Sequence, residues 1–137
     1  MLGLIRASDA YVSLHRSEGF GLGMAEALSF GRIVIGTDYS GSTDFLNDQT
    51  GYPVPYSLRP MLPHEYPFSE GQFWAEPDLD AAAKIMRHVV ADREEACYRG
   101  AAGRSFVLQR YSPRSVGRSI RARLSELCKQ SPVKKPV

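Results

Sequence analysis

Two carboxylates and three glycines lie close together near the start of the chain. Glu18 and Glu26 flank a stretch with glycines at positions 19, 21 and 23. Glycine lets a ligand approach the backbone directly, and the first amides of a helix have no intrahelical partner. If a helix begins near Leu22, its macrodipole adds about half a positive charge at this corner. The stretch is therefore suited to a phosphate or a sugar, and the carboxylates to the hydroxyl groups of a ligand.

Glu26 is the more informative carboxylate. Its neighbours along the expected helix are apolar, and a carboxylate that is desolvated without a partner is strongly destabilising. Helical side chains tilt toward the amino terminus, so Glu26 can point back to the glycines and accept two hydrogen bonds from a ribose diol. Glu18 follows an expected strand, at the edge where open α/β sheets bind ligands. Two simpler interpretations stay open: Glu18 caps the following helix, and Glu26 pairs with a surface base.

The elements that must position this corner have the pattern of a parallel β-α-β unit. Residues 10–14 form a short β-rich run, residues 22–30 contain good helix formers that end before Gly31, and residues 32–36 form an apolar β-branched run. Apolar strands on both sides of a helix are typical of a parallel sheet that is covered on both faces. Residues 1–7 indicate the last turns of a preceding helix.

Downstream of this unit the pattern changes. Residues 51–55 predict a short edge strand, and residues 57–73, which contain three prolines and no periodicity, predict a surface loop. Three helices with apolar stripes follow, the first capped by Asp78, the second including Cys97 and the third capped by Ser112.

We therefore expect an α/β fold class: a partial Rossmann-like parallel sheet with carboxyl-terminal helices over residues 1–128, and a polar flexible tail over residues 129–137. Three strands are fewer than a doubly wound sheet usually has, so we expect the amino-terminal part of the sheet to be missing from this chain.

Composition narrows the class of protein. The chain has 137 residues, of which 43% are hydrophobic, and its apolar runs are shorter than the roughly 18 to 20 residues that cross a bilayer. We expect a soluble cytoplasmic protein. Neither of the two cysteines has a second Cys or His at metal-ligand spacing, so we expect no metal and no cofactor.

Charge is distributed unevenly along the chain. Residues 99–137 contain ten Lys or Arg and one acid, giving +9, and the total of +2 leaves −7 for residues 1–98. A solvated helical surface is the simpler interpretation of the basic end. The alternative is peripheral docking on an anionic membrane surface at the inner membrane face, worth about 1 kcal/mol for each nearby basic residue. We expect no nucleic-acid binding, because an aromatic and basic platform is lacking.

A family resemblance sharpens these expectations. Glu18-Gly-Phe-Gly-Leu-Gly-Met-Ala-Glu26 resembles the Glu-x7-Glu motif of the retaining glycosyltransferases of the GT-B fold, group 1 (family four). Gly31-Arg-Ile-Val-Ile-Gly-Thr37 is similar to that family's Gly-x-Pro-Val-Ile-Ala-Thr strand, with Ile33 where proline is usual. Later family positions resemble Ser40-Gly41, Asp44 and Thr50-Gly51. The chain thus resembles the second half of the carboxyl-terminal, donor-binding domain.

The resemblance implies roles for individual residues. Glu18 would be the catalytic-site residue that contacts hydroxyls of the transferred sugar, and Glu26 would hold the ribose hydroxyls. Backbone amides from Phe20 to Leu22 would hold the sugar and the diphosphate. The donor-binding residues implied in this way are Gly19, Phe20, Gly21, Leu22 and Glu26.

Two residues before the motif depart from the family or carry charge near the site. Leu14-His15 stands where many members have Pro-Ser, and we expect His15 in the pocket wall. We expect Arg16 to be solvated rather than to clamp a phosphate.

The resemblance also implies a reaction. Sugar would move from a nucleoside diphosphate sugar to an acceptor hydroxyl with retained configuration, without a protein nucleophile, as in polysaccharide biosynthesis. The family's basic residues for the diphosphate, and its amino-terminal domain for a glycan or lipid-linked glycan acceptor, lie outside this chain. We therefore expect the donor-binding portion of such an enzyme, inactive as an isolated fragment. The alternative is a non-catalytic nucleotide-binding or interaction module left by truncation.

Overall fold

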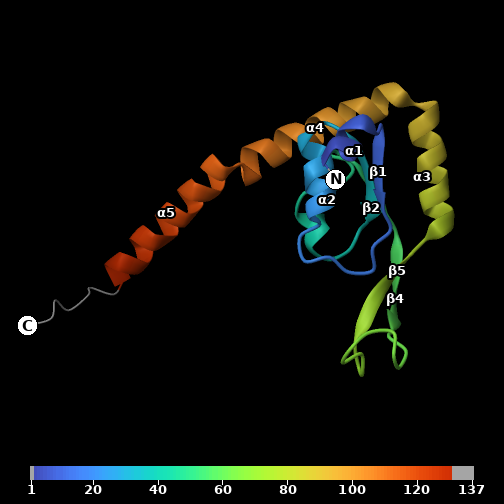
Figure 1. The fold of residues 1–137 in the computed structure, drawn as a ribbon, viewed down its shortest axis with the longest axis horizontal. Helices are drawn as coiled ribbons and strands as arrows, with labels where there is room; N and C mark the ends of the chain where they lie inside the picture. The colour runs from blue at the N-terminus through green and yellow to red at the C-terminus, as the bar shows by residue number, and fades with distance from the viewer. Residues whose placement is uncertain (1, 131–137) are drawn as a thin grey trace, which may run out of the picture.

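The computed structural model describes residues 2–130 and has an α/β architecture (Figure 1). Its main sheet has the strand order β1 (Ala10–Ser13), β2 (Ile33–Thr37) and β3 (Tyr52–Val54). Both pairings are parallel, with Ala10 opposite Ile33 in one and Ile35 opposite Tyr52 in the other. The expected α/β class with a parallel sheet and carboxyl-terminal helices is confirmed.

Helices cover both faces of this sheet. α2 lies on one side of it and α3 on the other, while α4 crosses the end of the sheet and contributes to the core on both sides (Figure 1). α5 continues beyond α4 and projects away from the sheet (Figure 1). The helices are α1 (Leu2–Ala7), α2 (Leu22–Ser29), the short 3-10 helix η1 (Ser40–Asp44), α3 (Leu79–Ala91), α4 (Arg93–Tyr111) and α5 (Pro113–Gln130).

β2 is the centre of the core, and all five of its residues are buried. Its side chains alternate between the two faces of the sheet, as a strand requires. Val34 packs in the cluster that includes Leu28 of α2 and Val107 of α4. Ile33 and Ile35 pack in the cluster of β3 and α3. Burial on both faces explains why this segment is an uninterrupted apolar run.

α4 packs closely against the connections on either side of the sheet. A Cβ at Gly103 would lie 2.6 Å from the Thr50 carbonyl oxygen, and one at Gly100 would lie 2.9 Å from the Gly31 carbonyl oxygen. The predicted apolar stripe of this helix was partly wrong, because Cys97 is exposed while Gly103 is buried. Two glycines make these close contacts of α4, so the hydrophobicity of its residues alone does not reveal which face of the helix is packed.

Residues 56–77 form an antiparallel hairpin where a surface loop was predicted. β4 (Tyr56–Pro60) pairs with β5 (Phe73–Pro77), with Tyr56 opposite Pro77. The loop prediction was wrong for the strand residues, because Pro60 stands at the end of β4, where a missing backbone N–H interrupts no ladder. The other two prolines of the predicted loop, Pro63 and Pro67, lie in the connection between the two strands.

The residues that the structure describes end within the predicted tail. Lys129 and Gln130 are the last residues of α5, and the rest of the predicted tail, residues 131–137, lies outside the described residues. Within residues 2–130, no helix is long and apolar enough to cross a bilayer.

Glu95 links α3, α4 and β3 through its carboxylate. His88 Nε2 lies 2.6 Å from this carboxylate, Arg99 Nε donates to it at 2.7 Å and the Tyr52 hydroxyl donates at 2.9 Å. The hydrogen bond from His88 is the largest cause that lowers the pKa of Glu95 to about 2. Burial, followed by the hydrogen bond to Glu95, raises the pKa of Tyr52 to about 12.

This network predicts a pH dependence of stability. A carboxyl group with a lowered pKa in the folded state stabilises the fold above its unfolded value, and this contribution is lost as pH falls through the folded value. The melting temperature should therefore fall as pH drops from 4.5 toward about 2, and it should fall less steeply in Glu95→Gln. Circular dichroism melts across this range measure the difference. Glu94→Gln on the same helix is the control, and equal slopes in wild type and Glu95→Gln would contradict the assignment.

Candidate functional site

Three connections meet at the carboxyl edge of the parallel sheet (Figure 1). The turn of residues 14–21 follows β1, η1 follows β2, and the hairpin β4–β5 follows β3. Parallel strands end on the same side, so their connections converge there, and open α/β sheets bind ligands at this edge. All six predicted site residues lie in the turn or in the first turns of α2.

The amino terminus of α2 is open to a ligand. Gly21 precedes the helix with a φ of 85°, a left-handed conformation that favours glycine, and no side chain caps the helix. The backbone amide of Ala25 donates to the Gly21 carbonyl at 3.0 Å. The amides of residues 22–24 therefore precede the first bonded turn and can donate to a ligand. Glu18 does not cap this helix, which removes one of the two simpler interpretations.

Ser40 and Gly41 hold the main chain of Glu18. The Ser40 hydroxyl accepts from the Glu18 amide at 2.8 Å and donates to the Glu18 carbonyl at 2.9 Å. The Gly41 amide also donates to this carbonyl, at 3.1 Å. A Cβ at Gly41 would lie 2.1 Å from the Gly19 carbonyl oxygen, so only glycine fits. These contacts use main-chain atoms and leave the Glu18 carboxylate available.

Neither predicted carboxylate is paired within the described chain. Glu26 is half-buried one turn into α2, and no side chain of the described residues donates to its carboxylate or forms an ion pair with it. The interpretation that Glu26 pairs with a surface base is therefore not supported. Glu18 is half-buried at the edge of the sheet and is likewise without an ion pair in this part of the chain.

The remaining predicted residues differ in exposure. Gly19 is exposed, Gly21 is buried and Leu22 is 69% exposed. The ring of Phe20 lies 5.2 Å from the rings of both Phe45 and Tyr111. Phe20 thus anchors the turn to the core while its backbone stays beside the open helix end.

His15 joins two of the converging connections rather than standing free in a pocket. Its Nε2 lies 3.1 Å from the Tyr39 carbonyl oxygen and 3.3 Å from the Ser42 hydroxyl, and its Nδ1 lies 3.4 Å from the Ser13 hydroxyl. Protein atoms surround both ring nitrogens, so His15 holds the end of β1 against η1.

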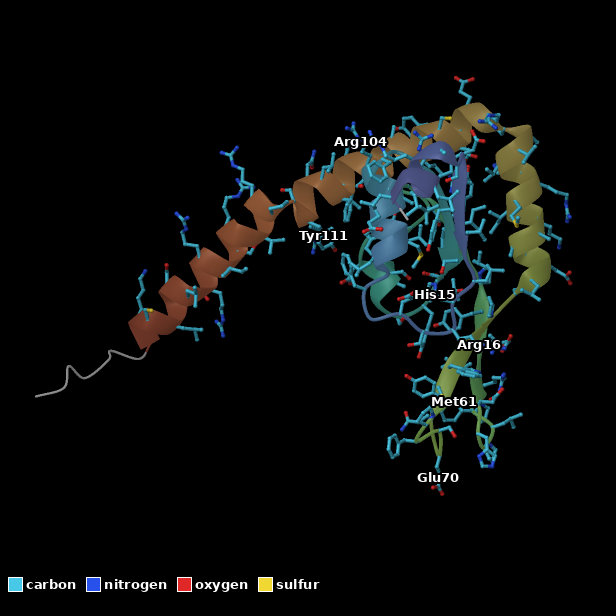
Figure 2. The ribbon with its side chains drawn as sticks, in the orientation of Figure 1. His15, Arg16, Met61, Glu70, Arg104 and Tyr111 are labelled. Atoms are coloured by element: carbon cyan, nitrogen blue, oxygen red, sulfur yellow. The ribbon has the colours of Figure 1, made fainter. Side chains whose placement is uncertain are left out.

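Arg16 is exposed, as predicted, and it also makes contacts that the sequence did not reveal. Its guanidinium forms an ion pair with Glu76 at 2.9 Å and lies 4.5 Å from the ring centre of Trp74. The Ala75 amide donates to the Arg16 carbonyl at 3.1 Å. Arg16 therefore docks the hairpin onto the turn, and the side-chain view shows Arg16 between His15 and Met61 (Figure 2).

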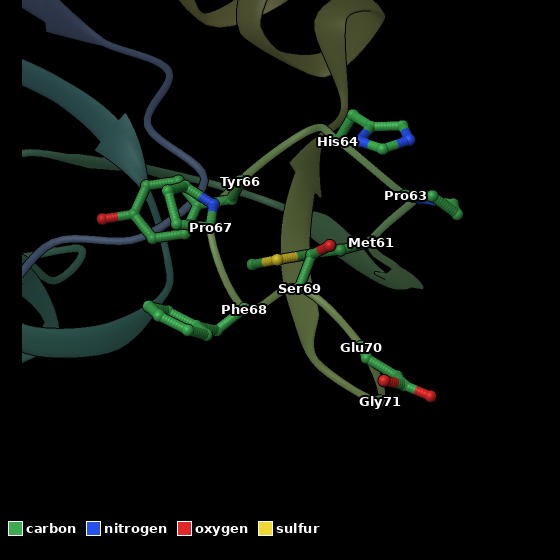
Figure 3. Close-up of a pocket in the computed structure, with 9 residues that line it drawn as sticks. All are labelled: Met61, Pro63, His64, Tyr66, Pro67, Phe68, Ser69, Glu70 and Gly71. Atoms are coloured by element: carbon green, nitrogen blue, oxygen red, sulfur yellow. The ribbon is translucent and has the colours of Figure 1, made fainter.

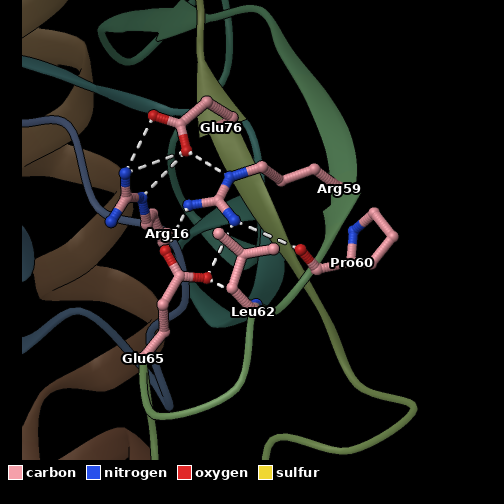
Figure 4. Close-up of polar contacts among 6 residues, drawn as sticks. All are labelled: Arg16, Arg59, Pro60, Leu62, Glu65 and Glu76. Carbon is pink, nitrogen blue, oxygen red and sulfur yellow. Dashed lines mark hydrogen bonds and ion pairs between the residues drawn. The ribbon is translucent and has the colours of Figure 1, made fainter.

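A network of charges stiffens the hairpin (Figure 4). Arg59 forms ion pairs with Glu65 at 2.8 Å and with Glu76 at 3.1 Å, and it lies 4.9 Å from the ring centre of Trp74. The hydrogen bond from Arg59 is the largest cause that lowers the pKa of Glu65 to about 2. The sequence did not reveal this network because its members were assigned to a loop without periodicity.

The described residues contain no group of three or more His, Cys, Asp or Glu side chains arranged to hold a metal ion.

Known proteins match this chain over residues that include this same edge of the sheet. Residues 2–60 match the family model of the glycosyl transferases group 1. The matched segment is less than half of the chain. It contains the turn, both carboxylates and η1, and it ends at Pro60, the last residue of β4. The predicted resemblance to group 1 is confirmed, and no curated protein matches the chain.

Solved structures share the fold of the whole described domain. Sucrose-phosphate synthase from Thermosynechococcus elongatus matches with a TM-score of 0.70 and 22% identity, over 93% of this chain and 27% of that one. HepE from Anabaena, in complex with UDP and glucose, matches with a TM-score of 0.67 and 18% identity, over 90% of this chain and 29% of that one. The predicted fold of a GT-B carboxyl-terminal domain is confirmed, and the chain spans less than a third of the length of these structures.

The stability of the fold around the turn of residues 14–21 should depend on Gly41. Gly41→Ala would force the backbone away from Gly19, and overpacking of this kind costs about 1 to 3 kcal/mol. Gly117→Ala is the control, because a Cβ at Gly117 meets no atom within 4 Å and alanine is the better helix former. Thermal unfolding followed by circular dichroism should show a lower melting temperature for Gly41→Ala alone. Equal melting temperatures for the two variants would contradict the close approach.

Proposed function

We propose that the chain is the donor-binding portion of a glycosyltransferase that moves a sugar from a nucleoside diphosphate sugar to an acceptor hydroxyl with retention. One observation carries the proposal: the uncapped start of α2 lies beside two unpaired carboxylates, within the segment that matches group 1. HepE is solved with UDP and with UDP-glucose, which supports this donor class for the present chain.

Each part of the site then has a role. The amides from Phe20 to Leu22 hold the diphosphate and the sugar, because donors at a helix amino terminus favour anions. Glu26 accepts hydrogen bonds from the ribose diol, and Glu18 accepts them from hydroxyls of the transferred sugar. Glycine at positions 19 and 21 lets the ligand approach the backbone.

The reaction requires positioning rather than a protein nucleophile. The departing phosphate oxygen takes the proton of the acceptor hydroxyl as the new glycosidic bond forms on the same face. Amides fixed at the leaving diphosphate stabilise its developing charge, and a fixed Glu18 holds the sugar in the reactive orientation. Such a reaction suits polysaccharide biosynthesis, with a glycan or lipid-linked glycan as the acceptor.

Residues 1–137 by themselves should bind the donor weakly and transfer no sugar. The structural neighbours are more than three times as long, and a three-stranded sheet offers only part of a dinucleotide-type cleft. The acceptor would be held by a part of a longer enzyme. Transfer from a nucleotide sugar by the isolated chain, followed by product chromatography, would contradict this proposal.

Nucleotide binding tests the donor site directly. Isothermal titration with UDP, GDP and ADP should detect binding of one of them, and Glu26→Ala should weaken it about tenfold or more, as expected for loss of a charged hydrogen bond. Glu70→Ala at the hairpin tip removes a carboxylate far from α2 and should leave the affinity unchanged. If no nucleotide binds, the non-catalytic interaction module becomes the better interpretation.

The surface of α5 supports a further partner. Val116, Ile120, Leu124 and Leu127 are all exposed, and they recur at three and four residues along the helix. The opposite side of α5 carries a basic groove with Arg114, Arg118 and Arg121. An apolar stripe with arginines on the polar face suits a helix that lies on an anionic bilayer. The proposed location is the cytoplasmic face of a membrane, bound peripherally.

Vesicle sedimentation tests this partner. The chain should sediment with vesicles of phosphatidylcholine mixed with phosphatidylglycerol, and salt should weaken the association. Arg118→Ala and Arg121→Ala should each reduce the partition coefficient about fivefold, and Arg87→Ala on α3 should not. Sedimentation that is the same with phosphatidylcholine alone would leave the solvated surface as the interpretation of α5.

A further inference from the structure

A cleft lies between the Glu18 turn and the hairpin. It has a volume of about 430 Å³, with Glu18 and Gly19 on one wall and Met61, Tyr66 and Trp74 on the other. A hollow of about 720 Å³ at the hairpin tip continues from it, because Met61 and Tyr66 line both. Figure 3 shows the rings of Tyr66 and Phe68 on the same side of the tip as the Met61 thioether. The hairpin is therefore the outer wall of the space in front of Glu18.

This wall is fixed relative to Glu18. The Ala75 amide donates to the Arg16 carbonyl, two residues before Glu18, and the Arg16 guanidinium is paired with Glu76. The guanidinium groups of both Arg16 and Arg59 lie over the ring of Trp74. Backbone, ionic and cation-π contacts thus hold the hairpin in place before any ligand binds, which reduces the ordering cost of binding.

The two walls of the cleft differ in chemistry. On the turn, Ser17 and Glu18 provide a hydroxyl and a carboxylate. On the hairpin, Tyr66 is 63% exposed and presents an aromatic ring beside the thioether of Met61. A pyranose has hydroxyl groups around its rim and C–H groups on its faces, so it can bond to the first wall and pack on the second.

In the proposed donor site, the nucleotide part of the donor lies outside this cleft. Glu26, the proposed ribose ligand, lies on α2 and does not line this cleft. The diphosphate belongs at the start of α2, which leaves the cleft beyond Glu18 for the sugar at the other end of the donor.

We propose that the hairpin β4–β5 closes the subsite for the transferred sugar, with Tyr66 packing on the sugar ring and acting as a specificity residue. This rests on the proposed function, in which Glu18 contacts the sugar of a nucleoside diphosphate donor. Residues 61–77 lie outside the segment that matches group 1, so the family match does not itself assign this wall a role.

Saturation-transfer-difference NMR tests the assignment within a single ligand. The probes are UDP-glucose, UDP-galactose and UDP-N-acetylglucosamine, with the GDP or ADP sugars instead if titration selects that nucleotide. In the wild-type chain the sugar protons and the ribose protons of at least one probe should both receive saturation. In Tyr66→Ala the sugar signals should fall about two- to tenfold relative to the ribose signals, and Tyr66→Phe should keep them.

Phe68→Ala is the matched control, because Phe68 is 97% exposed and lines only the tip hollow. Its ratio of sugar to ribose saturation should equal that of the wild type. An unchanged ratio in Tyr66→Ala, an equal loss in Phe68→Ala, or no saturation of any sugar while ribose is saturated would overturn the hairpin subsite and leave the donor site intact. Absence of both ribose and sugar signals would overturn the proposed function, and the subsite with it.

Discussion

The close approach of Gly41 to Gly19 is the constraint on which the rest of the site depends. Neighbouring parallel strands place the connections after β1 and β2 side by side, and the two backbones come too near for any side chain at Gly41. Ser40 completes the contact with a φ of 61°, an uncommon conformation for a residue other than glycine. Together they hold the Glu18 backbone in place before a ligand binds.

The turn held in this way contacts the core on one side and the hairpin on the other. On one side, Phe20 joins the aromatic cluster of Phe45 and Tyr111, and α2 packs on the central strand β2. On the other side, Arg16 binds the hairpin through Glu76 and Trp74. Phe20, Phe45, α2 and β2 lie in the segment that matches group 1, whereas Tyr111 and most of the hairpin lie beyond it. The Glu18 turn, which lies inside the matched segment, thus faces a hairpin that lies mostly outside it.

Sequence reasoning recovered the features that are local in the chain. Alternation and apolar runs predicted the strands of the β-α-β unit, and the helix formers before Gly31 predicted α2. That Glu18 and Glu26 serve one binding corner stays a prediction. Prediction failed where the contacting residues lie far apart in the sequence. The hairpin was predicted as a loop because residues 57–73 contain three prolines and no periodicity. The pairing of Arg16 with Glu76 was not predicted because the two residues lie sixty positions apart.

By itself, the sequence determined the group 1 resemblance, the α/β class and the candidate residues of the turn and of α2, because motif spacing and periodicity act over one or two turns of chain. The tertiary structure decided which groups remain free to bind. It showed that Glu18 caps no helix, that Glu26 lacks a partner within the described residues, and that the hairpin faces Glu18 across a cleft. These facts depend on strand order and on backbones meeting at the sheet edge, which no local pattern encodes.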